Sequence, residues 1–382
     1  PGQTLSYGEI APLLGLGRRF RSLGRADMTE LLRVLPMSVQ DLVDEWFEHE
    51  TIKAAVASGG IRDIQQEPRS GGTSFVLLHH LVGAPPGSIR ARGWWRDGTH
   101  AFSATAEALA RKAGVAIRPG AQVDRILVKD DAVTGVALAN GDEINAPLVI
   151  STTDPVRTLL RMVDPVWLDP EFLHAVRQIK LRGCTAFVIY ALDGLPVVTG
   201  LPDPKAALAS MVTLTPTTEA LERGYDAAKY GRISEHPHIE FTVPSLRWPR
   251  LAPEGKHVLV SRVQYAPYRL AGDATWDAAR SSSLADCVTS VLGRAMPKFA
   301  DHVVDQAVLT PVDLEQKLGL TEGAATQGEI TLDQILFMRP VAGWGRYAMP
   351  VGGLYLGGAG THPGPGIIGG PGWLAARRAL KG

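Results

Sequence analysis

The 382 residues suffice for one large domain or two medium-sized domains with a substantial buried core. Lysine plus arginine and aspartate plus glutamate number 39 each, so no net charge favours a nucleic acid or an anionic membrane surface as partner. Cys184 and Cys287 lie far apart and form no CxxC pair, which argues against a disulfide framework or a zinc site, and we predict no metal site.

The sequence also carries information about targeting. No run approaches about 18 consecutive apolar residues, so no transmembrane helix is expected. Residues 1–10 lack the charged and apolar regions of a signal peptide. We therefore expect a cytoplasmic protein, or a mitochondrial matrix protein if the source is eukaryotic. Because the chain starts at Pro1 and not at a methionine, we expect it to be an internal part of a longer gene product.

Residues 1–24 combine glycine, proline and arginine without periodicity and predict an irregular N-terminal segment. Helical patterns follow it over 37–50, 50–59 and 73–83. Ser38 and Asp41 form a capping box at the start of the first of these helices. Its expected apolar stripe consists of Leu42, Trp46 and Phe47. The third stretch is almost entirely apolar and predicts a buried helix.

A helix followed by strands is expected next. Residues 99–114 have apolar side chains at helical spacing, and Gly114 is a typical residue just past a helix end. Residues 115–152 then predict successive strands. The pairs Asp130-Asp131 and Asn140-Gly141 stand where tight turns between these strands are needed.

The rest of the chain divides into two parts. From about Asp154 to Arg339, strands such as 184–192 and 256–267 alternate with helices such as 273–296, joined by proline-rich loops. This pattern predicts a mixed α+β unit. The last 30 residues or so predict a short strand, a loop rich in glycine and proline, and a final helix.

The C-terminal loop is the most informative segment. Leu354 to Leu356 form a short apolar strand, and a helix begins near Pro371. Glycines at the density found between them allow positive φ and let the backbone approach a flat or phosphorylated ligand closely. The helix directs free N–H groups and its positive dipole end toward the loop. The loop therefore suits a cofactor pyrophosphate or the edge of a flavin ring; the alternative is a plain connection with glycines for tight turns.

In this loop and in several other segments, the chain resembles the phytoene desaturase, or phytoene dehydrogenase-related, family of FAD oxidoreductases. The resemblance covers about residues 28–378. Several segments agree with the family in the right order: 37–58, 133–144, 149–165, 308–323, 327–340 and 353–379.

The resemblance implies a cofactor, FAD, and a set of residues that bind it. In similar enzymes the C-terminal loop lies along the pyrophosphate, the ribityl chain and the isoalloxazine of FAD, which here implies Gly358, Ala359, Gly360, His362, Gly366 and Ile367. Val123 stands at a strand position that contacts the adenine through its backbone, and Ser151 and Thr152 belong to a loop that closes over the cofactor. His362 is the candidate catalytic residue, which would face flavin or substrate; a hydrogen bond that braces the loop is the alternative.

Three departures from the family pattern stand out. Residues 96–99 place Asp97 where the family has glycine, and Gln327 stands where it tends to have histidine. The strand–GxGxxG–helix unit that opens such FAD proteins is absent from the printed sequence, since the glycines of 15–24 follow no apolar strand. The chain therefore supplies the residues of one side of an FAD site. Incomplete binding of FAD by this chain alone, or loss of that binding, is an alternative that follows.

Other polar and aromatic pairs receive plainer interpretations. His79 and His80 are adjacent in an apolar run and are interpreted as one core and one surface histidine. Trp94 and Trp95 are interpreted as packing residues, with a substrate tunnel as the alternative. Asp313 and Glu315 follow Thr310-Pro311 and are interpreted as first-turn helix residues, not as a catalytic pair.

We predict an α/β fold: a partial Rossmann-like FAD-binding domain, without its GxGxxG half, and a mixed α+β substrate domain. The first consists of 93–155 and 335–382, the second of 25–92 and 156–334. The expected function is FAD-dependent dehydrogenation or desaturation of a hydrophobic small molecule by hydride transfer to flavin. The alternatives are a flavin-free degenerate relative that acts as a binding or scaffolding module, and an enzyme with another cofactor such as NAD. Expected partners are the substrate, the missing N-terminal segment or a second copy, and a membrane surface touched peripherally.

Overall fold

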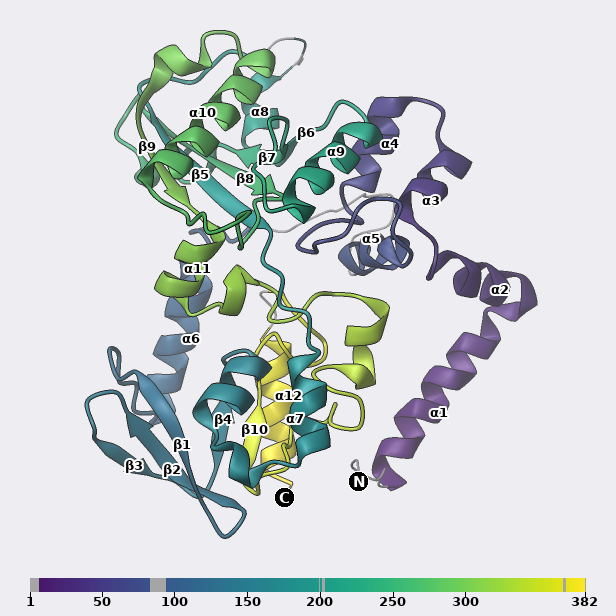
Figure 1. Ribbon diagram of the computed structural model, residues 1–382, viewed down its shortest axis with the longest axis vertical. Helices are drawn as coiled ribbons and strands as arrows, with labels where there is room; N and C mark the ends of the chain where they lie inside the picture. Colours follow the sequence, from purple (N-terminus) through teal and green to yellow (C-terminus); the bar gives the residue numbers. More distant parts are fainter. Residues whose placement is uncertain (1–6, 83–93, 199, 201–202, 367–368, 382) are drawn as a thin grey trace.

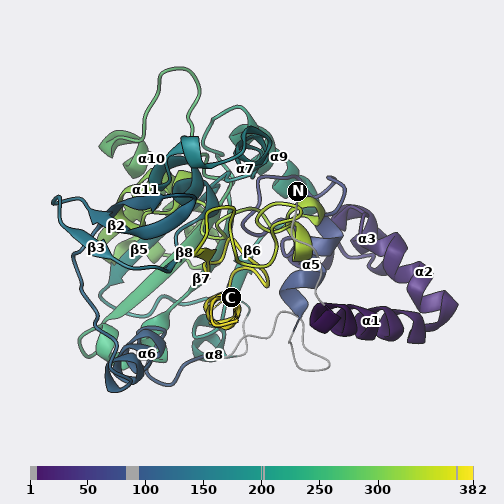
Figure 2. The ribbon, with the colours of Figure 1, turned by 90° about the horizontal axis from the view of Figure 1, so that it is seen from below.

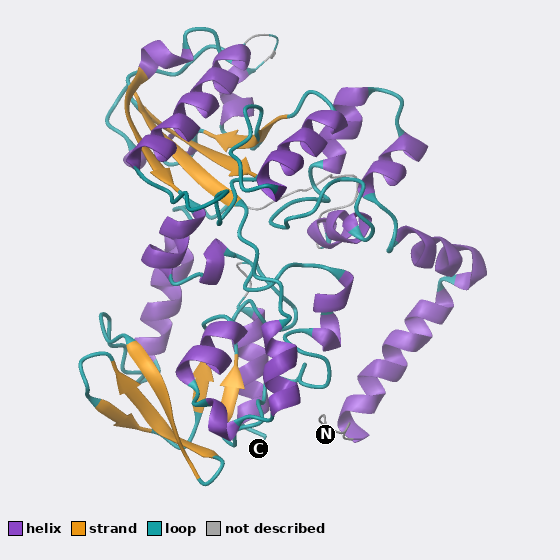
Figure 3. Ribbon diagram, viewed as in Figure 1, coloured by secondary structure: helices purple, strands orange, loops and turns teal. Residues whose placement is uncertain are grey.

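The computed structural model describes residues 7–82, 94–198, 200, 203–366 and 369–381. Two bodies that contain β-sheet lie one above the other, and a group of helices lies beside the upper body (Figure 1). The chain combines helices with β-sheets, and from about residue 185 onward the two kinds of element alternate (Figure 3), which agrees with the predicted α/β class. Across the described residues, no helix combines the length and the apolar character needed to cross a membrane.

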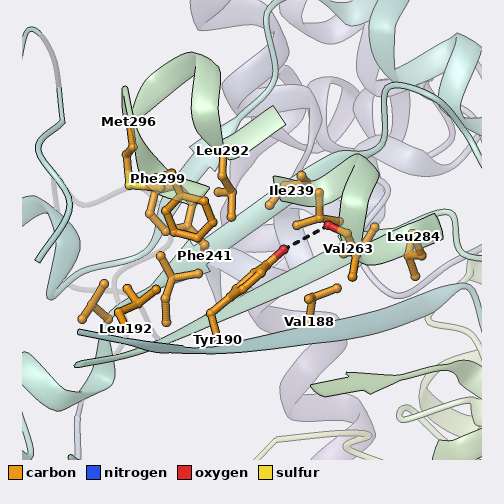
Figure 4. Close-up of a cluster of buried hydrophobic side chains, with 14 of the residues drawn as sticks. Val188, Tyr190, Leu192, Ile239, Phe241, Val263, Leu284, Leu292, Met296 and Phe299 are labelled. Carbon is orange, nitrogen blue, oxygen red and sulfur yellow. Dashed lines mark hydrogen bonds between the residues drawn. The ribbon is translucent and has the colours of Figure 1, made fainter. Parts of the chain in front are cut away.

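The upper body is built on an antiparallel five-stranded sheet with the order β6-β7-β8-β5-β9. Its strands are β5 (Thr185–Leu192), β6 (Val212–Leu214), β7 (His238–Thr242), β8 (His257–Gln264) and β9 (Val303–Leu309). Alternate residues of β5, such as Val188 and Tyr190, are fully buried against Leu284 and Leu292 of α10 (Ala278–Ala295). Figure 4 shows this cluster, which is the main core of the upper body.

The segment 61–66 covers the other face of this sheet. Glu240, 1% exposed, lies 3.4 Å from Arg262, and Arg262 donates to the carboxylate of Asp63 at 2.5 Å. Gln264 donates to two carbonyl groups of the same segment at 2.8 and 3.0 Å. Ion pairs and hydrogen bonds between buried groups thus attach the segment to the strands. A buried charge needs such a partner, because its removal from water is costly.

Helices α3 (Val39–Trp46), α4 (Glu50–Ala57), α5 (Thr73–Leu81) and α9 (Thr218–Lys229) pack beside the sheet. The amide of Asp41 donates to Ser38 Oγ at 3.0 Å, so the predicted helix start is confirmed. The predicted apolar stripe is wrong in one respect: Trp46 is 71% exposed, because α3 turns Val39 and Val43 toward α4 and α5.

The N-terminal segment is not irregular as predicted. Residues Tyr7–Ser22 form helix α1, and α2 follows over Gly24–Val34. Together they extend from the rest of the molecule as an arm (Figures 1 and 2). The prediction rested on the glycines and prolines of residues 1–24, whereas leucine and arginine, both strong helix formers, make up a large part of the segment.

The lower body contains an antiparallel meander and a parallel pair of strands. The meander consists of β1 (Val123–Lys129), β2 (Ala132–Leu138) and β3 (Glu143–Asn145). Asp130 and Asp131 have φ of 49° and 59°, as the predicted tight turn requires. The parallel pair is β4 (Val149–Ser151) with β10 (Leu354–Leu356).

Helices surround the parallel pair. These are the π-helix η1 (Arg157–Met162), α7 (Pro170–Arg177) and α12 (Gly370–Ala379). Helix α6 (His100–Lys112) precedes the meander and has no buried residue. The remaining helices are α8 (Pro204–Leu208), α11 (Pro311–Leu318) and the short η2 (Pro165–Trp167), η3 (Pro244–Leu246), η4 (Pro249–Leu251), η5 (Phe299–His302), η6 (Thr321–Gly323), η7 (Leu332–Gln334) and η8 (Leu336–Met338). Thr310 and Asp313 form the capping box of α11, so the interpretation of Asp313 as a first-turn residue is confirmed.

The core of the lower body combines residues from distant parts of the chain. Ile126 and Val133 of the meander are buried with Leu354 and Leu356 of β10, and Leu159 of η1 joins them. The predicted division of the chain into two domains stays a prediction. Its boundary at 155/156, however, cuts through this core, because η1 and α7 pack with the meander.

The predicted strand at 115–120 is absent from the structure, where 115–118 adopts neither helix nor strand. An extended segment becomes a strand only beside a neighbour that exchanges backbone hydrogen bonds with it. Val115 instead donates its amide back to the last turn of α6, to the carbonyl of Ala110 at 3.0 Å.

Candidate functional site

The parallel pair β4–β10 brings two loops to one edge of the sheet. Leu356 lies opposite Ser151, and the amide of Gly357 donates to the carbonyl of Ser151 at 2.8 Å. Beyond this point the C-terminal loop, residues 357–369, and the loop 152–155 leave the carboxyl ends of the two strands together. This edge is where open α/β sheets bind their ligands.

Two glycines of the C-terminal loop are explained by its approach to the neighbouring loops. A Cβ on Gly358 would lie 2.4 Å from the carbonyl oxygen of Thr152. A Cβ on Gly360 would lie 2.3 Å from Cδ of Pro155. The loop can therefore pack onto residues 152–155 only without side chains at these two positions.

Gln327 joins the two loops. Its side-chain amide donates to the carbonyl of Thr152 at 3.1 Å, and its Oε1 accepts the amide of Gly360 at 2.9 Å. Glutamine thus stands where the family tends to have histidine, and it places one donor and one acceptor between the two loops. Both groups form hydrogen bonds.

Arg339 anchors the C-terminal loop from below. It is 2% exposed, and its guanidinium donates to the carbonyl of Ala359 at 3.0 and 2.8 Å. Its other nitrogens bind carbonyl groups of the preceding loop, those of Thr326, Gly328, Glu329 and Gln334, at 2.5 to 3.2 Å. Residues 326–334 and the C-terminal loop are therefore held in one arrangement.

His362 lies half-buried in the loop, and its carbonyl accepts from the hydroxyl of Tyr347 at 3.0 Å. Its Nδ1 is buried and has no hydrogen-bond partner within the described part of the chain. Burial lowers the pKa of His362, and the charge of Arg339 lowers it further. This nitrogen is therefore left to form a hydrogen bond with a group bound at the loop.

His79 reaches the same neighbourhood from α5. Burial, Arg339 and His362 all lower its pKa, which places it within electrostatic reach of both. His79 and His80 are each half-buried, so the interpretation of one core and one surface histidine is wrong. Sequence reasoning missed His79 and Arg339, although Arg339 lies inside a segment that carries the family resemblance.

The other residues predicted to bind the cofactor lie in different settings. The hydroxyl of Ser151 contacts the hydroxyls of Thr158 at 2.7 Å and Thr153 at 3.1 Å, so only the backbone of Ser151 meets the C-terminal loop. Val123 is half-buried at the start of β1, and the hydrogen bonds that hold the C-terminal loop within the described residues do not involve it. Gly366 is exposed with φ of 140°, and Ile367 lies outside the described residues.

The loop that carries Asp97 binds another partner. The indole of Trp248 donates to the carbonyl of Trp95 at 3.1 Å, and Arg250 donates to the carbonyl of Asp97. The ring of Trp94 lies 5.6 Å from that of Trp248, so the interpretation of this tryptophan as a packing residue agrees with the structure. This loop therefore joins the lower body to the segment after β7.

The flavin containing amine oxidoreductase family matches residues 61–379, most of the chain. The chain belongs to this family. This finding is consistent with the predicted resemblance to flavin-dependent oxidoreductases, since members of the matched family contain a flavin.

Individual relatives agree with this assignment. The chain is 34% identical over 379 residues to the rat (Rattus norvegicus) pyridine nucleotide-disulfide oxidoreductase domain-containing protein 2, and the match covers 97% of the chain and 64% of that protein. It is 27% identical to a lycopene-forming phytoene desaturase of Pseudescherichia vulneris, with 94% of the chain and 68% of that protein covered. The chain thus spans less than two thirds of the length of the rat relative.

Solved structures show the same fold. An oxidoreductase from Methanosarcina mazei matches with a TM-score of 0.58 at 15% identity, over 96% of this chain and 75% of that one. A putrescine oxidase variant matches with a TM-score of 0.52 at 14% identity, over 91% of this chain and 68% of that one. The predicted fold class, an α/β fold of the FAD oxidoreductase type, is therefore confirmed.

The residues of the site fit a flavin nucleotide on one side. His362 offers an unsatisfied nitrogen, and Gly364 and Gly366 have φ of 100° and 140°, a backbone conformation that favours glycine. The first turn of α12 follows directly and presents its free N–H groups. Among the described residues no group of three or more histidine, cysteine or acidic side chains is placed to hold a metal ion.

Proposed function

We propose that this chain forms the C-terminal wall of the FAD site of an oxidoreductase that dehydrogenates a hydrophobic small molecule. The observation that carries the proposal is the joint exit of the 152–155 and 357–369 loops from the parallel strands β4 and β10. Bound FAD would accept the hydride there. The protein would position the cofactor through Ala359, His362 and Gly366 and exclude water from its ring.

The class of substrate is inferred from the named relatives. Phytoene desaturases match 94% of the chain in the best-covered example, and phytoene is a hydrocarbon. A redox reaction in which the cofactor performs the chemistry needs few acids and bases from the protein. This is consistent with a site in which the described residues near the loop include two histidines, His79 and His362, whose pKa is lowered, and no acidic side chain bound to the loop.

The other wall of the site is proposed to come from a segment outside these residues. The described residues supply two strands, β4 and β10, to the parallel sheet. A strand–GxGxxG–helix unit from a segment outside the printed sequence, or from a second protein chain, would extend that sheet and contribute the pyrophosphate loop.

A flavin-free binding or scaffolding module is the second candidate. One observation favours it: Gly358 and Gly360 are already required by contacts with Thr152 and Pro155, so these two positions do not by themselves demand a ligand. Under this alternative the C-terminal loop is a packed connection.

Two measurements on the full-length gene product separate these proposals. The first is the visible spectrum of the purified protein, in which the two bands of oxidised flavin are expected. The second is anaerobic mixing with a polyene hydrocarbon dispersed in detergent, and separately with putrescine or cyclohexylamine. Bleaching of the flavin by the hydrocarbon alone is expected. Bleaching only by amines would refute the substrate class, and a colourless protein that does not take up added FAD would favour the scaffolding module.

A further inference from the structure

Arg339 is a buried cation whose hydrogen bonds, within the part of the chain that the structure describes, go to no acidic side chain. All six hydrogen bonds of its guanidinium end on backbone carbonyl oxygens. Burial lowers the pKa of Arg339 to about 10, so it stays charged at neutral pH. Glu329 contributes only its carbonyl, because its carboxylate accepts from Arg182 at 2.9 and 2.5 Å.

This arrangement differs from that of the other strongly buried arginine. Arg262 is 7% exposed and is neutralised by Asp63 and Glu240. Burial of a charge costs several kcal/mol unless a partner of opposite sign compensates it. Carbonyl dipoles offset part of that cost for Arg339, but they bring no net negative charge. A buried charge whose hydrogen bonds are made but whose counter-charge is not supplied by the described residues is expected mainly at functional sites.

The charge of Arg339 reaches the site from below the C-terminal loop. A Cβ on Gly364 would lie 3.9 Å from its Nε, and the carbonyl of Ala359 is bound directly. His79 on α5 and His362 in the loop both experience this charge. The positive potential therefore extends over the surface on which the proposed cofactor would lie.

We propose that Arg339 is a positioning residue of the cofactor site, which fixes the C-terminal loop through the carbonyl of Ala359 and whose charge is balanced by negative charge on a bound flavin nucleotide. This inference rests on the proposed function. The anionic groups of the nucleotide would supply the charge that the described residues do not bring to Arg339. His362 and His79 then remain neutral beside the cation.

The test compares Arg339→Lys and Arg339→Gln in the full-length gene product. Lysine keeps the charge but cannot reproduce six hydrogen bonds, whereas glutamine keeps polarity and loses the charge. FAD affinity, measured by equilibrium dialysis, is expected to fall about 10- to 100-fold in the glutamine variant and less than about 10-fold in the lysine variant. Arg262→Gln is the matched control, which should lower stability without changing the FAD affinity of the folded protein.

A second measurement needs no cofactor. NMR titration of the histidine ring protons in the FAD-free protein should give higher pKa values for His79 and His362 in Arg339→Gln than in the wild type and in Arg339→Lys. Equal loss of FAD affinity in both variants, with unchanged histidine titration, would overturn the proposal and leave a purely structural role.

The outcomes also separate this inference from the function on which it rests. A wild-type protein that binds no FAD refutes the proposed function, while the histidine titration still tests the charge. If Arg339→Gln does not fold, the lysine variant decides: a native circular dichroism spectrum with FAD binding abolished contradicts the proposal, and binding within about 10-fold of the wild type supports it.

Discussion

The amide of Gly360 donates a 2.9 Å hydrogen bond to Oε1 of Gln327, a residue 33 positions earlier in the chain. The same side chain donates to Thr152, so one glutamine connects both loops that leave the parallel strands. Gln327→Ala removes both bonds and is expected to lower the free energy of unfolding by about 1–2 kcal/mol and to weaken FAD binding. Urea denaturation and FAD titration measure the two effects.

The exposed Gln316 on α11 offers the matched control. Gln316→Ala should change neither quantity by more than about 0.5 kcal/mol. Equal effects of the two substitutions would show that Gln327 does not connect the loops.

Gly358→Ala is expected to displace the C-terminal loop. The new Cβ would meet the carbonyl oxygen of Thr152 at 2.4 Å, a contact that the backbone can relieve only by moving. We expect a loss of about 1–3 kcal/mol of stability together with loss of bound flavin. Gly372→Ala in α12 is the control, because its Cβ would lie 3.8 Å from its nearest neighbour. Retention of full flavin content by Gly358→Ala would contradict the close packing of the loop.

The stability of the protein should rise with pH through the range in which unfolded histidine titrates. The pKa values of His79 and His362 lie below the ordinary value of 6.5 in the folded protein because both rings are partly buried and Arg339 is near. The unfolded chain therefore binds more protons just below that pH. The stability that the two neutral histidines contribute is fully present above the pKa of unfolded histidine. It is lost as the pH falls from that value toward the lower pKa that the two histidines have in the folded protein.

Urea denaturation of the wild type and of the double variant His79→Gln/His362→Gln checks this expectation. The double variant should show a flatter rise of unfolding free energy between about pH 5 and pH 7. Identical slopes would mean that other groups cause the pH dependence.

Glu240 is expected to be the most sensitive carboxylate of the upper body. It is 1% exposed and lies between Arg62 and Arg262. Glu240→Gln leaves these cations with too little negative charge and should cost about 3 kcal/mol of stability. Glu219→Gln breaks an exposed pair with Arg223 and should cost less than about 1 kcal/mol. Thermal denaturation of the two variants measures the difference, and similar costs would show that burial does not strengthen the Glu240 network.

Local signals in the sequence predicted the local parts of the structure. The Ser38 cap, the turn at Asp130-Asp131 and the final strand, loop and helix each depend on residues close together in the chain. Their chemistry is therefore visible in a short window. The glycine-rich loop was found for the same reason, and the predicted contacts of its residues with FAD remain predictions.

Interactions between distant residues were missed. Arg339 acts on a carbonyl group 20 residues away, and nothing in its immediate sequence shows that its side chain is buried. His79 and His362 come within electrostatic reach of each other although they lie far apart in the chain. The prediction of a strand at 115–120 was wrong for a related reason. A strand requires a neighbour that exchanges backbone hydrogen bonds with it, and the sequence of the segment does not show whether such a neighbour is present.

The two-stranded parallel sheet has a practical consequence for work with this protein. In the described residues β4 has a strand neighbour on one side only. A strand edge without a neighbour accepts an extended segment from another molecule. Samples of these residues should therefore be checked for self-association as they are concentrated.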